Sequence, residues 1–196
     1  MFKGKRLFLD LETTGVEKLI HGVYQIAGLI EINNKVIDEF NFRCNLTPNR
    51  DIDPEALLIN KITEVQIKSY PRPEIVCKQL TEILEDYNEE FYSDTKFTIV
   101  GYNTSFDIDF IKRWFDDLGY SRFHMLQDWQ PVCVLSMARI LRDLGDKLLV
   151  KAPNMKLVTL CRLLEIPHNP HDALSDIKAT RILRQKLIRR LLKQQG

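Results

Sequence analysis

The segment LFLDLE, residues 7–12, has leucine at every odd position and Phe8, Asp10 and Glu12 at the even ones. Because successive side chains of a strand point to opposite faces, this alternation predicts a strand with one apolar face. Asp10 and Glu12 share the other face, where two carboxylates repel each other unless a cation lies between them. The turn Thr13-Thr14-Gly15 follows, and its glycine permits backbone N–H groups to approach a ligand closely.

Further strands and helices are predicted along the chain. Residues 24–32 and 35–45 read as strands that flank a two-residue hairpin turn, Asn33-Asn34. A short helix is expected after Pro54, strands over 97–102 and 132–134, and longer helices over 73–88, 105–118, 135–144, 156–164 and 173–193. This order predicts one α/β domain, residues 1–196, in which helices cover a mixed sheet.

Composition excludes several classes of protein. Apolar residues make up 44% and charged residues 28% of the 196 positions, which is typical of a globular domain. No apolar run approaches the roughly 20 residues of a membrane span, and the N-terminus does not resemble a signal peptide, so we expect a cytoplasmic protein without a membrane partner. The four cysteines form no CxxC pair and are interpreted as reduced core thiols.

Positive charge is concentrated near the C-terminus. The formal net charge is only +1, but no acidic residue follows Asp176. The pattern is typical of a solvated helix face, and a surface that attracts phosphate is the alternative. Seven basic residues make up this stretch: Lys178, Arg181, Arg184, Lys186, Arg189, Arg190 and Lys193.

Two further carboxylates are predicted to point inward from helix starts. Asp107 shares a helical stripe with Ile111 and Trp114, and Asp176 shares one with Leu183 and its apolar neighbours. An acid there could simply interact with the helix dipole, but burying it is costly without a compensating charge. His171, five residues before Asp176, lies in a proline-bounded loop; taken alone, it would be interpreted as a solvated side chain.

Together these segments supply four carboxylates, Asp10, Glu12, Asp107 and Asp176, and one histidine. Oxygen ligands in this number favour Mg²⁺ or Mn²⁺ over zinc. Two such ions would balance the charge and would support phosphodiester cleavage. His171 could take the proton from the attacking water.

Three motifs resemble those of the DEDDh (DnaQ-like) 3′–5′ exonucleases, among them the proofreading subunit of bacterial DNA polymerase III. They are DLETTG at 10–15, GYNTSFD at 101–107 and HDALSD at 171–176. Asp172, four residues before Asp176, replaces the tyrosine of the sister group. The resemblance implies a ribonuclease H-like fold with a five-stranded mixed sheet. It also implies two Mg²⁺ or Mn²⁺ ions on Asp10, Glu12, Asp107 and Asp176, and His171 as general base.

The same resemblance suggests substrate-binding positions. Thr13 matches the residue that meets the terminal nucleotide, Ile62 one that contacts its base, and Asn103 one that supports the second motif. There are departures: Tyr102 stands where many members have histidine, Asn60-Lys61 replaces a common His-Gly, and Cys133 falls where relatives often carry aspartate.

Three hypotheses follow for the function. The first is an exonuclease that shortens single-stranded DNA from its 3′ end, with a DNA polymerase as a possible partner. The sequence Glu-Thr-Thr-Gly in the first motif favours this hypothesis. The second is an RNA-trimming enzyme of the oligoribonuclease or ribonuclease T type. The third, a non-catalytic nucleic-acid-binding or polymerase-binding module, should have lost a metal ligand. The oligomeric state stays open.

Overall fold

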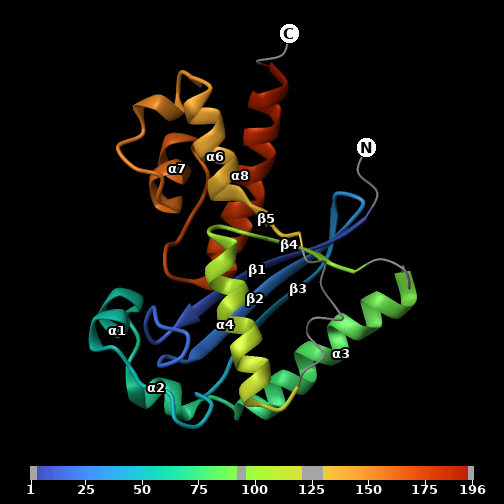
Figure 1. Ribbon diagram of the computed structural model, residues 1–196, viewed down its shortest axis with the longest axis vertical. Helices are drawn as coiled ribbons and strands as arrows, with labels where there is room; N and C mark the ends of the chain where they lie inside the picture. Colours follow the sequence, from blue (N-terminus) through green and yellow to red (C-terminus); the bar gives the residue numbers. More distant parts are fainter. Residues whose placement is uncertain (1–3, 92–95, 121–129, 194–196) are drawn as a thin grey trace.

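A five-stranded mixed sheet forms the centre of the molecule, as the computed structural model shows (Figure 1). The structure describes residues 4–91, 96–120 and 130–193, with only the backbone for residues 88–91. The strand order is β3-β2-β1-β4-β5, and the strands are β1 (Lys5–Thr13), β2 (Val23–Ile32), β3 (Lys35–Arg43), β4 (Thr98–Gly101) and β5 (Val132–Cys133). β2 runs antiparallel to β1 and β3, whereas β1, β4 and β5 are parallel. This is the ribonuclease H-like arrangement that the motifs implied.

The β2–β3 hairpin turns at the two asparagines that the sequence indicated. Ile32 pairs with Lys35, so Asn33 and Asn34 alone form the turn. Their φ angles are 51° and 68°, the left-handed region that a tight hairpin requires and that asparagine tolerates better than most residues.

Helices cover both faces of the sheet (Figure 1). On one face lie α3 (Pro73–Phe91) and α4 (Thr104–Asp117), and on the other α6 (Val134–Asp143), α7 (Leu157–Leu163) and α8 (Ala173–Lys193). Two short helices, α1 (Pro54–Asn60) and α2 (Glu64–Ser69), lie near the end of β1. Among the helices that the structure describes, none is long and apolar enough to cross a membrane.

Strand β1 divides the two cores. Leu7, Leu9 and Leu11 pack in the core with α3 and α4, whereas Phe8 packs in the core with α6, α7 and α8. Because side chains alternate along a strand, Asp10 and Glu12 continue the Phe8 face toward α8. The predicted alternation therefore decides which helix layer meets the carboxylates.

Two short elements were not predicted. Helix α2 lies where no helix was expected, and it begins with a capping box in which the Thr63 hydroxyl accepts from the Gln66 N–H. Between the helices predicted over 135–144 and 156–164 lies a 3₁₀ turn, η1 (Leu149–Lys151). Most of the segment between the helix predicted over 105–118 and the strand predicted over 132–134 lies outside the described residues.

Candidate active site

Three predicted carboxylates meet where the end of β1 faces the start of α8. One ligand oxygen each from Asp10, Glu12 and Asp176 lies within 4.8 Å of the others. Asp10 and Glu12 come from the same face of β1, and Asp176 lies in the first turn of α8. Residues 166 positions apart thus form one group of oxygen donors, the chemistry that Mg²⁺ and Mn²⁺ prefer.

The fourth carboxylate, Asp107, lies beside this group and is held by the backbone of β1. The N–H of Leu11 donates a 3.2 Å hydrogen bond to Asp107 Oδ1. Asp107 is buried in the first turn of α4, and its negative charge raises the pKa of Asp10. The structure therefore brings all four predicted acids to one place, with Asp107 outside the tight group of three.

Every one of these acids has a raised pKa. Burial is the main cause for Glu12, whose pKa rises to about 8, and the negative charges of Asp176 and Asp172 add to it. Burial also raises the pKa of Asp10, helped by Asp107 and Asp176. The charged groups that raise the pKa values of Asp10 and Glu12 are thus other carboxylates. A bound cation would supply positive charge that offsets this repulsion.

The turn after β1 is fixed by its own side chains. The buried Thr14 hydroxyl donates to the Asp51 carbonyl and accepts from the Gly22 N–H. Gly15 is required by close packing, because a Cβ there would lie 2.5 Å from the His21 ring. The sequence indicated that this turn mattered, but the role of Thr14 depends on segments distant along the chain.

The predicted substrate-binding residues lie around this turn and the start of α4. Thr13 is buried, and its hydroxyl donates to the Gly15 carbonyl at 2.7 Å. Its carbonyl accepts from Nδ2 of Asn60, the last residue of α1, at 3.4 Å, and half-buried Ile62 follows two residues later. Asn103 precedes α4 with φ of 64° and an exposed side chain. Thr13 directly follows Glu12 and Asn103 lies four residues before Asp107, and the roles of all three positions toward substrate stay predictions.

Two histidines, not one, act on Asp176. His171 is exposed, with φ of 65°, and its backbone N–H and charge lower the pKa of Asp176 against the larger raising effect of burial. His168 Nε2 lies 2.6 Å from Asp176 Oδ1, and its side chain is only 5% exposed. The sequence reading selected His171 and missed His168, which only its place in the fold distinguishes from an ordinary loop histidine.

Cys133 also lies close to the carboxylates and differs from the other cysteines. Cys44, Cys77 and Cys161 are buried, as expected, but Cys133 is only half-buried. Burial raises its pKa, yet hydrogen bonds from Ser136, Thr104 and Asn103 outweigh this effect and lower the pKa to about 7. The thiol therefore does not fit the prediction of an ordinary core cysteine.

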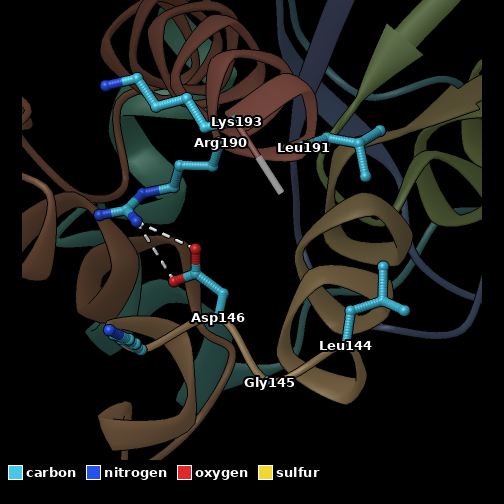
Figure 2. A pocket seen from close by; sticks show the side chains of 7 residues that line it. Leu144, Gly145, Asp146, Arg190, Leu191 and Lys193 are labelled. Atoms are coloured by element: carbon cyan, nitrogen blue, oxygen red, sulfur yellow. Dashed lines mark hydrogen bonds and ion pairs between the residues drawn. The ribbon is translucent and has the colours of Figure 1, made fainter. Parts of the chain in front are cut away.

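Helix α8 uses much of its positive charge within the chain. Lys178 pairs with Glu39, Arg181 with Glu31 and Arg190 with Asp146, and Lys186 donates to the Leu164 carbonyl. The Arg190–Asp146 pair lies in a hollow of about 740 Å³ between the ends of α6 and α8 (Figure 2). At 1.5 Å per residue, Arg190 is roughly 21 Å along the helix from Asp176. These contacts favour a structural role over a phosphate-attracting surface.

Comparison with known proteins matches this arrangement. Residues 7–183 match the family model described as Exonuclease. The DNA polymerase III subunit epsilon of Rickettsia conorii is 30% identical over 88% of this chain and 68% of its own length. The PolC-type DNA polymerase III of Oceanobacillus iheyensis is 24% identical over the whole chain, which spans only 12% of that protein.

Solved structures of Escherichia coli exonuclease I share the fold. A zinc-bound complex with single-stranded DNA has a TM-score of 0.77 and 23% identity, covering 96% of this chain and 41% of that one. Another exonuclease I structure has a TM-score of 0.76 and 21% identity, covering 95% and 41%. With the matched family model and the three motifs in place, the chain belongs to the DnaQ-like 3′–5′ exonuclease family.

Proposed function

We propose that residues 1–196 form a single exonuclease domain that removes nucleotides from the 3′ end of single-stranded DNA and releases nucleoside 5′-monophosphates. The observation that carries this proposal is the group of oxygens from Asp10, Glu12 and Asp176 within 4.8 Å, with buried Asp107 beside it. A non-catalytic module would have no need to keep four mutually repelling acids at one place.

The donor set fits divalent cations. All four carboxylates have raised pKa values, and for Asp10 and Glu12 the causes are burial and other acids. A cation that enters the site would therefore stabilise their ionised forms. Two bound Mg²⁺ or Mn²⁺ ions would lower the pKa of a water molecule and neutralise charge on the reacting phosphate. Asp10, Glu12, Asp107 and Asp176 would hold them.

The chain's own residues perform the other tasks. His171, exposed on its loop beside Asp176, accepts the proton of the attacking water. Thr13 and Ile62 border the place of the terminal nucleotide. Asn103, whose left-handed backbone starts α4, supports the position of Asp107 four residues later. The rigid turn around Thr14 keeps this border fixed relative to β1.

DNA is the proposed substrate because of the relatives. Those named above include polymerase III subunits and an exonuclease I bound to single-stranded DNA, which favours DNA over RNA and makes a replicative polymerase the proposed partner. The chain spans only part of the length of several of these proteins. The polymerase partner is therefore proposed from what the relatives are, whereas the reaction is proposed from the residues of the site.

The test uses three substrates labelled at the 5′ end: single-stranded DNA, double-stranded DNA and a short RNA, each with Mg²⁺ and with Mn²⁺. We expect a ladder of products shortened from the 3′ end, fastest on single-stranded DNA and absent in EDTA. Faster cleavage of the RNA would move the assignment to an RNA-trimming enzyme. No cleavage of any substrate with either metal would refute catalysis.

A further inference from the structure

His168 makes the most direct contact with the carboxylate cluster from outside it. It lies on the segment between α7 and α8, and its Nε2 is 2.6 Å from Asp176 Oδ1. Its side chain is 5% exposed, whereas that of Asp176 is 19% exposed. The His168 ring is therefore more deeply buried than the carboxylate that it contacts.

The segment that carries His168 is fixed at both ends. Before it, Ile166 is buried, and its N–H donates to the Cys161 carbonyl in α7. After it, the Asn169 N–H donates a 2.8 Å hydrogen bond to the hydroxyl of Ser175, the neighbour of Asp176 in α8. The backbone on either side of His168 is thus held by contacts that do not involve the imidazole.

A fixed ring N–H on one oxygen of a carboxylate restricts the rotation of that carboxylate. A carboxylate offers about four lone-pair sites, so Asp176 still has sites for a cation beside the contacts of His168 and of the His171 N–H. Such outer hydrogen-bonding partners orient metal ligands and typically contribute 10–100-fold to metal affinity. His171, by contrast, is exposed and free to meet solvent or substrate.

We infer that His168 is a positioning residue, whose hydrogen bond to Asp176 orients this carboxylate for a divalent cation, and that His168 and His171 have separate tasks. The inference rests on the proposed function, because it assigns His168 a role at the same metal centre. It goes beyond the family motifs, in which His171 is the only histidine.

The experiment measures Mn²⁺ binding to the full chain without substrate, from the electron paramagnetic resonance signal of free Mn²⁺ during a titration. We expect His168→Ala to weaken binding about 10–100-fold, and His168→Gln, which can present an N–H at a similar reach, to restore most of it. Asn169→Ala is the matched control, since its backbone hydrogen bond is kept, and it should bind Mn²⁺ as the wild type does.

Cleavage kinetics then separate positioning from proton transfer. His168→Ala should need more Mn²⁺ for half-maximal rate but should reach nearly the wild-type kcat at saturating Mn²⁺. Unchanged Mn²⁺ affinity in a folded His168→Ala protein would overturn the inference, and so would a lost kcat with normal Mn²⁺ binding. If the alanine variant does not fold, His168→Asn, whose amide is too short to reach Asp176, replaces it and should bind weakly where His168→Gln binds well.

Failure of the proposed function gives a different result. If the wild-type chain binds no Mn²⁺ and Asp10→Asn behaves identically, there is no metal centre, and the inference fails together with the function. If the wild type binds Mn²⁺ and Asp10→Asn does not, but His168→Ala matches the wild type, only the inference fails.

Discussion

The peptide N–H of Leu11 donates a hydrogen bond of 3.2 Å to the carboxylate of Asp107, 96 residues further along the chain. Leu11 stands between Asp10 and Glu12 on β1, so this bond fixes the first turn of α4 against the strand that carries both acids. The contact gives Asp107 a structural role beside the metal-binding role proposed for it, and substitution can separate the two.

Asp107→Asn should abolish cleavage while keeping the fold. The amide oxygen can still accept from Leu11, but the negative charge is lost, and we expect activity to fall more than about a hundredfold, since even outer partners of metal ligands contribute 10–100-fold. Asp107→Ala should also be inactive but less stable than the asparagine variant by about 1–3 kcal/mol, because the Leu11 N–H loses its partner.

Cleavage of a 3′-labelled single strand and thermal unfolding check this pair. Asp116→Asn is the matched control, because Asp116 is an exposed acid on the same helix. Normal cleavage by Asp107→Asn would show that Asp107 is not part of the active centre.

The metal-free protein should lose stability as pH rises from about 4.5 to about 8. The pKa of Glu12 is raised from its ordinary value of 4.5 to about 8, chiefly by burial and then by Asp176 and Asp172. Within this window the native state retains a proton that the unfolded state has released, so the free energy of unfolding decreases with increasing pH.

Melting temperatures in EDTA across this range test the sign. Glu12→Gln should flatten the slope, whereas Glu74→Gln, at an exposed acid of α3, should leave it unchanged. Mg²⁺ should raise the melting temperature more at pH 8 than at pH 6, because it binds the ionised carboxylates. A wild-type melting temperature that increases with pH in EDTA would contradict the burial of Glu12.

The fold could be predicted largely because its signals are local. Alternation over residues 7–12 defines β1 and the face that its acids share, and two asparagines define the hairpin. Helix α2 had a local signal too, the Thr63–Gln66 capping box, which the sequence reading overlooked. A six-residue helix has too few turns to show a clear apolar stripe.

The site could be predicted only in part, because some of its contacts depend on how a loop folds back and others join segments distant in the chain. Nothing in the neighbourhood of His168 in the sequence distinguishes it from a solvated loop histidine, and its contact with Asp176 depends on how α7 and α8 pack. The basic residues of α8 were interpreted without their partners, Glu31, Glu39 and Asp146, which lie elsewhere in the chain.

Lys61→Gly should stabilise the protein. Lys61 follows α1 with φ of 52° and ψ of 39°, the left-handed conformation that glycine adopts most easily. In this conformation a non-glycine residue destabilises the folded state by roughly 1–2 kcal/mol. Replacement by glycine removes this strain but loses about 0.5–1 kcal/mol, because glycine has more conformational entropy in the unfolded chain.

We therefore expect a gain of about 1 kcal/mol or less in the free energy of unfolding, measured by denaturant titration. Lys61→Ala is the control, because it removes the ammonium group but keeps the strained backbone and should give no gain. Equal gains in both variants would assign the effect to the charge of Lys61.

His171→Ala should lower kcat and leave metal binding intact. General acid–base groups typically contribute 10²–10⁴-fold, and His171 is exposed beside Asp176, where it can take a proton from water. Mn²⁺ affinity, measured as for His168, should stay within a few-fold of the wild type. A variant that loses Mn²⁺ binding would make His171 a metal ligand.

Cys133 should be the reactive cysteine of the native protein. Its pKa of about 7 reflects hydrogen bonds from Ser136, Thr104 and Asn103 that outweigh burial, whereas burial raises the pKa of Cys77 to about 11 and those of Cys44 and Cys161 to about 12. Since the thiolate is the nucleophile, alkylation by iodoacetamide should reach half its maximal rate near pH 7.

Peptide mapping after brief alkylation identifies the labelled residue, and Cys133→Ser should remove the fast phase. The same position can also test helix capping: Cys133 precedes α6, and an acid at such a position accepts helix N–H groups. Cys133→Asp should therefore fold and be more stable than Cys133→Ala by about 1 kcal/mol. Fast labelling at Cys44, Cys77 or Cys161 instead would mean that the core around that thiol opens, contrary to its burial.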